Sequence, residues 1–451
     1  MTETRIVVVG GGLAGMAGAL ASADGGAHVT VIERRPWLGG LTWSFQRRGR
    51  WYDNGQHVFL RCCTAYLDFL DRIGARGDVV LQERLNIAVL RPHHRTGWLR
   101  RSPHLPAPLH LAASLARYPH LGATDRLRLA RATVSLARLD LDDPALDSQT
   151  FETWLAAHGQ RPEAISALWN LIALPTLNLP ASEASLAMAT KVFQTGLLTE
   201  RRAADIGRSR VPLGKLHGEN GTAALEACGA AVITGERVLQ VGKGAASRLM
   251  VQTERRALAA DAVILALPHY ALNAVLPSYR VPDIGVSPIV NIHVLYDRQV
   301  TDLPFAAAID SPVQWVFDRT SAAGVDHGQY LAVSLSAADD QLGERPEVLS
   351  GRIVTALADL FPPARTARVV DTLVTREPKA TFRARPGTAA LRPGPTTATP
   401  GLFLAGAWTD TKWPATMEGA VRSGLAAARS ALVDAGPTRR LPARRWPAEV
   451  A

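Results

Sequence analysis

Three glycines and one carboxylate have the spacing of an anion-binding turn. Gly10, Gly12 and Gly15 form the pattern G-x-G-x-x-G directly after an apolar run, and Glu33 closes the next apolar run. Glycine allows a tight turn and a close approach of the backbone to a pyrophosphate, whose charge is favoured at a helix N-terminus. A carboxylate about 20 residues further on accepts hydrogen bonds from a ribose diol. The pattern therefore predicts a dinucleotide site.

Such a site needs strands and a helix to position it. Residues 5–9 predict a buried strand, and the alanine-rich stretch that opens with Leu13 and Ala14 predicts a helix. Residues 28–32 predict a second strand, and residues 261–268 predict a buried strand that a proline ends. Shorter strands are predicted between these, at 230–233, 238–241 and 248–251.

The composition is that of a folded protein with a basic surface. The chain has 451 residues, 47% of them hydrophobic, and a net charge of +10; this length suits two intertwined domains. The charge fits an anionic ligand or membrane surface, and no nucleic-acid-binding motif accompanies it. Cys62, Cys63 and Cys228 offer neither a disulfide framework nor a metal-binding spacing, as expected in a reducing cytoplasm. We expect neither a signal peptide nor a membrane-spanning segment, because no apolar run reaches about 20 residues.

The residues after the second strand narrow the choice of nucleotide. The segment Glu33-Arg34-Arg35-Pro-Trp-Leu-Gly39-Gly40 resembles the E-x-R-x-x-x-G-G extension of FAD enzymes built like amine oxidases and phytoene desaturases. The resemblance implies that Glu33 holds the adenosine ribose. It also implies that Gly39 and Gly40 let the chain run beside FAD.

One position departs from that pattern. Leu41 stands where the family carries an arginine that contacts the pyrophosphate. Arg34, Arg35 or Arg47 are then left to supply the positive charge. For Arg34 and Arg35 the alternative is a solvated basic turn, since arginine is mostly exposed in folded proteins.

A second match to this family lies near the C-terminus. Residues 401–424 resemble its closing motif, A-G-D-x-x-x-x-x-x-P-x-x-M-E-G-A-x-x-S-G. The resemblance implies that the chain passes FAD at Gly406 and Met417, where a helix N-terminus faces the flavin ring. Ala407 stands where the family carries an aspartate for the ribityl chain, and Asp410 on the same loop is a candidate replacement. Weaker or altered FAD binding is the expected consequence.

The middle of the chain resembles one branch of the family. Residues 51–60, which contain the sequence Asn-Gly-Gln-His, and residues 169–185 resemble the squalene-associated branch, the hydroxysqualene dehydroxylase family. The resemblance implies that Gly55 lies beside the flavin and Val238 near the adenine. It spans about residues 5–432 and implies an FAD-dependent enzyme that removes the hydroxyl of hydroxysqualene, a long apolar isoprenoid, to form squalene for hopanoid synthesis.

The implied reaction indicates which side chains could do chemistry. Loss of a protonated allylic hydroxyl leaves a delocalised cation, and FAD supplies the hydride. We therefore expect a proton donor beside the flavin, with His57 as the first candidate and Asp410 as the second. A lone histidine is more commonly a structural residue, and that alternative stays open for His57. Asp53 is expected to be structural within its turn.

The predicted fold class is α/β: a Rossmann-like FAD-binding domain of the GR2 type, interleaved with an α+β substrate domain. Helical spacing dominates from residue 62 to 202, with a helix start expected at Ser182. Alternation over 286–336 predicts an antiparallel sheet. The expected boundaries are 1–62, 206–283 and 386–436 for the FAD-binding domain, 63–205 for a helical, membrane-facing part, 284–385 for the antiparallel sheet and 437–451 for a basic tail.

The sequence also indicates where such an enzyme would work. Residues 125–138 place arginines around an aliphatic stripe, which fits either a helix on an anionic membrane or a core helix with a solvated arginine face. With an apolar substrate and a positive net charge, we expect a cytoplasmic enzyme bound peripherally to the inner face of the cell membrane. A single dinucleotide site implies an external electron donor. The tail 437–451 is expected to be disordered, with a surface tether as the alternative.

Two other classes of function remain open. The first is a carotenoid-type isoprenoid desaturase or an amine oxidase, although no aromatic cage for an amine can be identified in the sequence. The second is a flavin- or isoprenoid-binding protein without turnover, which the departures at Leu41 and Ala407 motivate.

Overall fold

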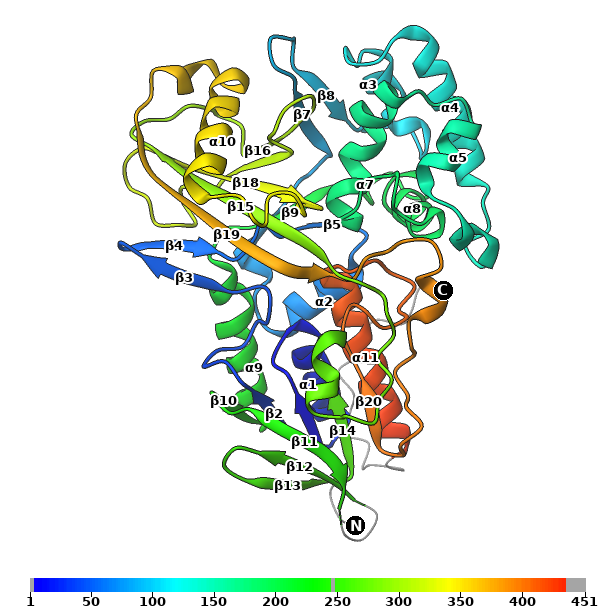
Figure 1. Cartoon of the computed structure of the whole chain (residues 1–451), viewed down its shortest axis with the longest axis vertical. Helices are drawn as coiled ribbons and strands as arrows, with labels where there is room; N and C mark the ends of the chain where they lie inside the picture. The colour runs from blue at the N-terminus through cyan, green and yellow to red at the C-terminus, as the bar shows by residue number, and fades with distance from the viewer. Residues whose placement is uncertain (1–3, 245–247, 435–451) are drawn as a thin grey trace.

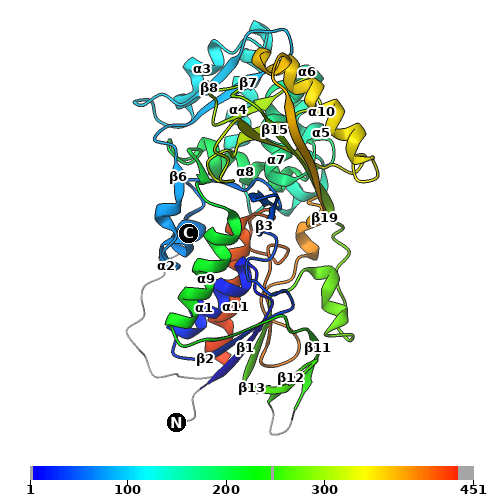
Figure 2. The ribbon, with the colours of Figure 1, turned by 90° about the vertical axis from the view of Figure 1, so that its left-hand side faces the viewer.

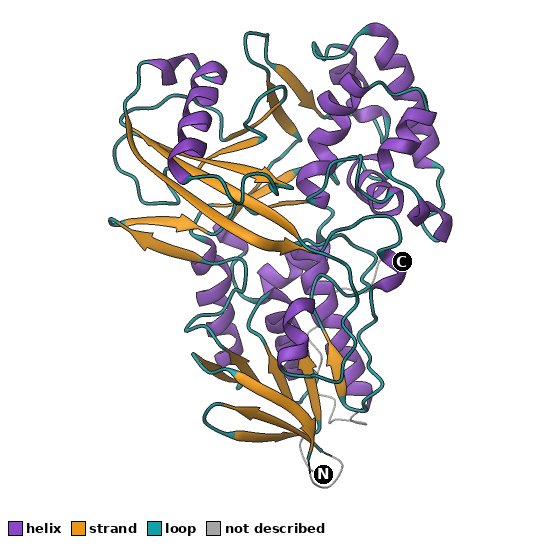
Figure 3. Ribbon diagram, in the orientation of Figure 1, coloured by secondary structure: helices purple, strands orange, loops and turns teal. Residues whose placement is uncertain are grey.

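The computed structural model describes residues 4–244 and 248–434, so the expected basic tail lies outside the described residues. The molecule has two halves along its long axis (Figure 1). The lower half holds a parallel sheet with helices against it, and the upper half holds a mostly antiparallel sheet beside a layer of helices (Figure 3). The chain passes between the halves several times, because segments from its beginning, middle and end all contribute to the lower sheet.

The lower half is built on a five-stranded parallel sheet with the order β10-β2-β1-β14-β20. Its strands alternate with long crossovers, and their apolar residues are buried on both faces, as parallel strands require. The predicted strands at 5–9, 28–32, 230–233 and 261–268 are confirmed. The bounds are Arg5–Val9 for β1, His28–Glu33 for β2, Ala231–Thr234 for β10, Ala262–Leu265 for β14 and Leu402–Leu404 for β20.

Three helices pack along this sheet, as the side view in Figure 2 shows: α1 (Leu13–Asp24), α9 (Asn220–Ala227) and α11 (Met417–Asp434). Helices α1 and α11 approach each other closely at Gly18 and Gly424. A Cβ on Gly424 would lie only 2.1 Å from the Ala14 carbonyl oxygen. Glycine is therefore required for this close packing. Because α1 follows β1 and α11 follows β20 in the parallel sheet, the N-termini of both helices lie at the same end of the sheet.

A small antiparallel sheet adjoins the lower half. It consists of β11 (Val238–Lys243), β12 (Leu249–Thr253) and β13 (Ala257–Ala260), in that order. The first two strands match the predictions at 238–241 and 248–251. The third strand was not predicted, because its alanine-rich sequence carries little strand propensity.

The upper half contains a seven-stranded sheet with the order β19-β15-β18-β17-β16-β7-β8. The antiparallel pairing predicted over 286–336 is present, and α10 (Pro346–Leu360) packs on this sheet. The bounds are Asn86–Leu90 for β7, Gly97–Arg100 for β8, Ser287–Tyr296 for β15, Phe305–Ala308 for β16, Trp315–Asp318 for β17, Gln329–Ser336 for β18 and Val369–Thr381 for β19.

The region expected to be helical from residue 62 to 202 differs from the prediction at its start. It contains β6 (Val79–Leu81), β7 and β8, and β7 pairs in parallel with β16, more than 200 residues later. Short apolar runs of this kind cannot be assigned to strands from periodicity alone, and their strand partners lie far away in the sequence. The prediction that helical structure dominates was therefore wrong over residues 79–100.

The rest of this region is helical, and from residue 112 onward it forms a layer at the upper right of Figure 1. The helix expected to start at Ser182 begins instead at Leu186, where α8 follows Ser185. The helical elements with their bounds are α2 (Thr64–Arg72), α3 (Ala112–Ala116), α4 (Ala123–Ala137), α5 (Phe151–Ala157), α6 (Pro162–Ala164), α7 (Asn170–Leu177) and α8 (Leu186–Phe193). No helix within residues 4–244 and 248–434 combines the length and the apolar character needed to cross a bilayer.

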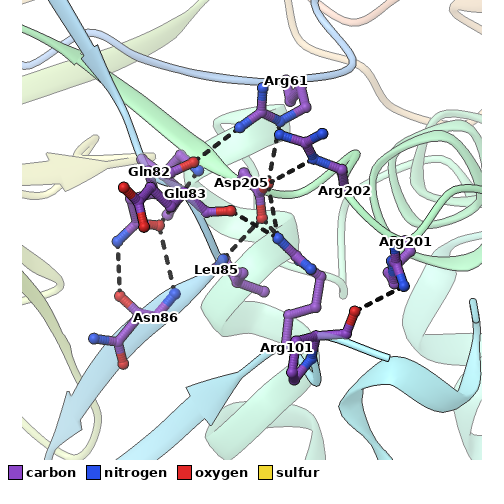
Figure 4. A network of polar contacts seen from close by, with 11 residues as sticks. Arg61, Gln82, Glu83, Leu85, Asn86, Arg101, Arg201, Arg202 and Asp205 are labelled. Atoms are coloured by element: carbon purple, nitrogen blue, oxygen red, sulfur yellow. Dashed lines mark hydrogen bonds and ion pairs between the residues drawn. The ribbon is translucent and has the colours of Figure 1, made fainter. Parts of the chain in front are cut away.

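One buried carboxylate fixes the junction between the halves (Figure 4). Asp205 precedes β9 (Ile206–Ser209), which pairs with β6 and with β5 (Val58–Leu60). Its side chain accepts hydrogen bonds from Arg61 at 3.1 Å, from Arg101 at 3.0 and 3.1 Å, and from the Leu85 amide at 2.8 Å. The charge and both oxygens of this buried group are thus satisfied by three separate segments of chain.

Candidate active site

The glycine turn after β1 has the geometry of a nucleotide cradle. Gly10 adopts φ +106°, and a Cβ on it would lie 2.4 Å from the Ala266 carbonyl oxygen. A Cβ on Gly15 would lie 1.8 Å from the Gly10 carbonyl oxygen. At Gly12, in contrast, a Cβ would meet only the Gly40 Cα, at 3.7 Å. The turn is therefore closed on its inner side and open above Gly12, where a ligand can approach the backbone.

The helix that follows this turn offers free donors. Gly12 is the N-cap of α1, and Leu13 and Ala14 form its first turn. No side chain in the described part of the chain caps this N-terminus, and its first turn carries no acidic residue. The backbone N–H groups and the positive end of the helix dipole therefore favour an anion such as a pyrophosphate.

Glu33 is buried beside this turn. Its carboxylate accepts hydrogen bonds from the Gly11 amide at 2.7 Å and the Arg35 amide at 2.9 Å. The segment with the paired glycines folds against the same turn, since the Gly39 amide donates to the Gly11 carbonyl at 2.8 Å. A Cβ on Gly40 would lie 2.9 Å from the Gly12 Cα. The structure thus brings together the predicted residues of the fingerprint and of its extension.

Leu41 cannot supply the charge that an arginine would bring to this position, and one nearby arginine contacts the glycine pair Gly39-Gly40 instead. The Arg35 guanidinium donates to the Gly40 carbonyl at 3.0 Å, and it lies over the Trp43 ring at 5.7 Å. Arg34 is exposed, in keeping with a solvated turn, and one guanidinium nitrogen of Arg47 is buried without a partner in the described residues. Of the three predicted arginines, Arg35 is therefore the one that the fold attaches to the glycine pair.

Val238 is buried at the start of β11. The preceding loop contacts the fingerprint, because the Gly235 amide donates to the Arg35 carbonyl at 2.9 Å and the Glu236 amide donates to the Glu33 carbonyl at 3.1 Å. Val238 therefore directly follows the loop 235–237, which is hydrogen-bonded to the predicted ribose-binding segment.

The C-terminal motif forms the other side of the site. Gly406 has φ +142°, and its amide donates to the Ser423 hydroxyl of α11 at 2.8 Å. Met417 is buried as the first residue of α11. The next residue, Glu418, is fully buried and accepts hydrogen bonds from the Tyr66 amide at 2.7 Å and the Ala65 amide at 3.2 Å. Burial raises the pKa of Glu418, and the two amides and Arg422 oppose this rise.

Arg392 holds the loop that carries Ala407. Its buried guanidinium donates to the carbonyls of Ala407 and Trp408, each at 3.2 Å, and to the carbonyl of Thr409. Burial lowers the pKa of Arg392 to about 10, so it stays charged at neutral pH. This arginine was not predicted as a functional residue, because its partners are backbone carbonyls that no sequence motif reveals.

Asp410 lies further along the same loop. Its carboxylate pairs with the Lys412 ammonium at 3.1 Å, and its backbone amide donates to the Pro393 carbonyl at 2.8 Å. The Asp410 carboxylate is thus held by an ion pair on its own loop. The pair also leaves Asp410 available as a hydrogen-bond acceptor.

His57 follows the Asn54-Gly55 turn and is half-buried. Its Nδ1 lies 3.3 Å from the Gly55 carbonyl oxygen. Burial lowers the pKa of His57 below its ordinary value, while the Gly55 carbonyl and the Asp53 carboxylate act in the opposite direction. Burial therefore favours the neutral imidazole, which must take up a proton before it can act as an acid.

Asp53 organises the segment that carries His57. Its carboxylate accepts hydrogen bonds from Ser44 at 2.6 Å, from the Leu213 amide at 2.9 Å and from Arg319 at 2.7 Å. These contacts come from three parts of the chain and agree with the expected structural role of Asp53. A buried aspartate predicts a cationic partner, but the sequence cannot say which arginine provides it.

A small pocket, partly open to solvent, lies beside the Asp53–Arg319 pair. It is lined by Asp53, Gln56, His57, Val58, Arg208, Ser209, Leu213, Phe317, Asp318 and Arg319. Its walls come from the segment before β5, from β9 and from β17 with the residue after it. His57 therefore faces a space rather than a packed core on at least one side.

Several buried polar atoms around the Gly55 turn have no partner within the described residues. Asn291 on β15 donates weakly to the Asn54 carbonyl at 3.4 Å, and its Oδ1 is unsatisfied. The others are Trp43 Nε1, Gln56 Nε2 and His217 Nδ1. Buried polar groups without partners are rare in folded proteins. Together with the open face at Gly12, these atoms would be available to a polar ligand such as FAD.

Comparison with protein families gives one match over most of the chain. The model for the flavin-containing amine oxidoreductases matches residues 13–432. Among curated proteins, the chain is 26% identical to the hydroxysqualene dehydroxylase of Zymomonas mobilis, over 94% of this chain and 98% of that protein. It is 28% identical to the enzyme of that name from Rhodopseudomonas palustris, over 95% and 98%. It is also 24% identical to the zeta-carotene desaturase of Zea mays, over 94% and 82%.

Solved structures show the same fold. An oxidoreductase from Methanosarcina mazei superposes with a TM-score of 0.73 at 16% identity, over 94% of this chain and 99% of that one. The cyclohexylamine oxidase of Brevibacterium oxydans superposes with a TM-score of 0.72 at 18% identity, over 96% and 99%. A flavin held in a dinucleotide site is FAD. The chain therefore belongs to the family of flavin-containing amine oxidoreductases and is an FAD-dependent oxidoreductase.

Proposed function

We propose that this oxidoreductase removes the hydroxyl of hydroxysqualene and forms squalene for hopanoid synthesis. The observation that carries the proposal is the similarity, over nearly the whole length of both chains, to curated hydroxysqualene dehydroxylases. The Asn-Gly-Gln-His sequence at 54–57 supports it, because this segment packs against β15 and lines the pocket described above.

The chemistry requires a proton and a hydride. Protonation of the allylic hydroxyl lets it leave as water, and hydride addition to the resulting delocalised cation gives the hydrocarbon. One proton and one hydride are consumed and one water is released. When bound, FAD in its reduced form supplies the hydride. The protein must hold the carbinol carbon near the flavin, deliver the proton to the hydroxyl oxygen and exclude other water.

His57 is the proposed proton donor. Its ring borders the pocket, and the Asp53 carboxylate favours its protonated form. Because burial lowers the pKa of His57, only a small fraction of the free enzyme carries the proton at pH 7. We therefore expect turnover to increase as the pH falls below neutrality. Asp410 is the second candidate, and its carboxylate is paired with the Lys412 ammonium.

The cofactor contacts proposed for this chain follow the geometry of the cradle. Gly10, Gly12, Leu13, Ala14 and Gly15 would hold the pyrophosphate at the α1 N-terminus, and Glu33 the ribose. The remaining proposed contacts are Arg34, Arg35, Gly39, Gly40, Gly55, Val238, Gly406 and Met417. An external donor would reduce the flavin, and the protein would work at the inner face of the cell membrane, where its apolar substrate is stored.

A carotenoid-type desaturase is the second candidate, because zeta-carotene desaturases are similar to this chain over most of its length. The two activities move electrons in opposite directions. A desaturase removes hydrogen from its substrate and leaves the flavin reduced, whereas the proposed dehydroxylase consumes reduced flavin.

The test is an anaerobic reaction of the purified protein, with its flavin photoreduced, and hydroxysqualene. The proposal predicts that the oxidised-flavin spectrum returns while squalene accumulates, one mole for each mole of flavin. His57→Gln should bind FAD normally and react slowly. If His57→Gln reacts at the rate of the unmodified protein, the assignment of the proton donor is wrong, while the proposed reaction stands.

A further inference from the structure

Helix α4 is apolar on its outer face. Its inner face packs into the core through Leu129, Ala132 and Leu136. On the opposite side, Leu127 is 68% exposed and Val134 is 45% exposed. These two residues are two helical turns apart and therefore share one stripe. The exposed alanines of the same stripe are Ala123, Ala130 and Ala137.

This outer face is unusual for a helix on a protein surface. Surface helices normally carry polar residues on the side that faces solvent. Here the charged residues of the stripe are Arg131 and Arg138, both exposed. An apolar stripe flanked by arginines has the composition of a helix that lies in the plane of a membrane interface.

The sequence that precedes α4 and forms it contains almost no negative charge. Between residues 84 and 139 the only carboxylate is Asp125, which is buried and paired with Arg161. Carboxylates return at Asp140, after α4 has ended. The same stretch contains many arginines, at positions 84, 91, 95, 100, 101, 117, 126, 128, 131 and 138.

Part of this positive charge is used inside the fold. Arg101 is bonded to Asp205, Arg126 donates to the Tyr118 carbonyl and Arg91 pairs with Asp310. Arg131 and Arg138 remain on the outer face of α4. The segment before α4 adds exposed apolar residues without any acid, with Leu105 at 40% and Leu109 at 57% exposure.

We propose that the outer face of α4, formed by Leu127, Arg131, Val134 and Arg138, docks on an anionic phospholipid bilayer. The arginines would meet the lipid phosphates, and Leu127 and Val134 would enter the boundary between headgroups and acyl chains. A nucleic acid would neutralise the arginines but offers no apolar layer for the two aliphatic side chains. The face lies at the end of the molecule away from the parallel sheet (Figure 1), so docking leaves the nucleotide cradle accessible.

This inference deepens the proposed function, since an enzyme for a bilayer-dissolved isoprenoid must reach the bilayer. Its test needs neither substrate nor turnover. Failure of membrane binding would therefore leave the proposed reaction untouched, and a protein that binds vesicles without converting hydroxysqualene would refute only the reaction.

The experiment is flotation of the full-length FAD-loaded protein with vesicles of phosphatidylcholine, or of phosphatidylcholine mixed with phosphatidylglycerol. The proposal predicts binding to the mixed vesicles, weaker binding at high salt and little binding to pure phosphatidylcholine. The variants L127S/V134S and R131E/R138E should each lower the partition coefficient by about tenfold or more. All four residues are exposed, so the variants are expected to fold, which the FAD absorbance and the melting temperature check.

Matched controls separate the face from general properties of the protein. K215E/R255E changes the net charge as much as R131E/R138E does, at exposed positions outside α4. V348S/L391S removes two exposed aliphatic side chains elsewhere. Both controls should bind vesicles like the unmodified protein. If K215E/R255E loses as much binding as R131E/R138E, or if L127S/V134S binds unchanged, the outer face of α4 is not the docking surface.

Discussion

Arg319 donates to Asp53 at 2.7 Å across 266 residues of sequence, and both side chains are almost fully buried. The same guanidinium donates to the Ser209 carbonyl at 2.6 Å and the Val211 carbonyl at 3.2 Å. This ion pair joins the turn that carries His57 to β17 and to the chain after β9. The position of the proposed proton donor therefore depends on a contact between the two halves of the molecule.

Removing Arg319 should be strongly destabilising. Arg319→Met leaves the Asp53 carboxylate buried without a cation, which costs about 3–5 kcal/mol of the free energy of unfolding. Asp53→Asn/Arg319→Met removes both charges and should recover part of that loss. Denaturant unfolding of the three proteins measures the difference. Equal stability of Arg319→Met and the unmodified protein would show that the pair does not hold this junction.

The Glu33 carboxylate should contribute to FAD affinity. Glu33→Gln removes the charge that accepts two amide hydrogen bonds in the turn, and we expect FAD to bind about 10- to 100-fold more weakly. Titration of the apoprotein with FAD, followed by flavin fluorescence, measures the dissociation constant. Glu254→Gln, on the exposed turn after β12, is the matched control and should leave the affinity unchanged. An unchanged affinity in Glu33→Gln would contradict the assigned role.

The contact between α1 and α11 leaves no room for a methyl group at Gly424. In Gly424→Ala the new Cβ would lie 2.1 Å from the Ala14 carbonyl oxygen and 2.9 Å from the Gly18 nitrogen. The helices must separate, at a cost of about 1–3 kcal/mol, and thermal unfolding should report a lower melting temperature. Gly351→Ala is the control, because a Cβ there meets nothing within 4 Å. Gly351→Ala should leave the melting temperature unchanged or raise it slightly, because alanine favours helix α10 more than glycine does.

Two buried histidines should make the fold sensitive to acid. Burial lowers the pKa of His217 and of His293 from 6.5 to about 3. Below pH 6.5 these histidines bind protons in the unfolded chain but stay neutral in the folded protein. Their contribution to the free energy of unfolding is therefore fully present above pH 6.5 and is lost as the pH falls toward 3. At pH 5.5 the two histidines together should lower the free energy of unfolding by about 3 kcal/mol.

Denaturant unfolding at neutral and mildly acidic pH tests this expectation. The variant His217→Gln/His293→Gln should be less stable at neutral pH, because it loses packing and the hydrogen bonds to Tyr66 and Tyr330. Its stability should nevertheless fall less steeply with acid than that of the unmodified protein. An identical pH dependence in both proteins would mean that these histidines are not the source of the effect.

The nucleotide half could be predicted closely from the sequence, because its signals are local. The glycine spacing, the apolar strand before it and Glu33 after it all lie within 30 residues, and the structure joins them as expected. The closing motif also predicted a helix N-terminus at Met417, which is the first residue of α11. Where a function depends on neighbours in the sequence, the residue pattern is sufficient.

The rest depended on contacts that no local pattern encodes. The strand β7 was missed because its partner β16 lies more than 200 residues away. Arg319, Arg392 and Asn291 were missed because each acts on a backbone or side chain in another segment. An isolated arginine or asparagine in a strand or loop carries no sign of the group that it will meet.

The central claim is that the enzyme reduces hydroxysqualene, and isotope transfer tests it most directly. The anaerobic reaction of photoreduced protein with hydroxysqualene is run in D₂O. The hydrogen that the reduced flavin transfers as hydride exchanges with solvent and is then deuterium. The account predicts squalene that carries one deuterium at the carbon that lost the hydroxyl, formed as the oxidised-flavin spectrum returns. Unlabelled squalene, or a product with additional double bonds and a flavin that stays reduced, would contradict it.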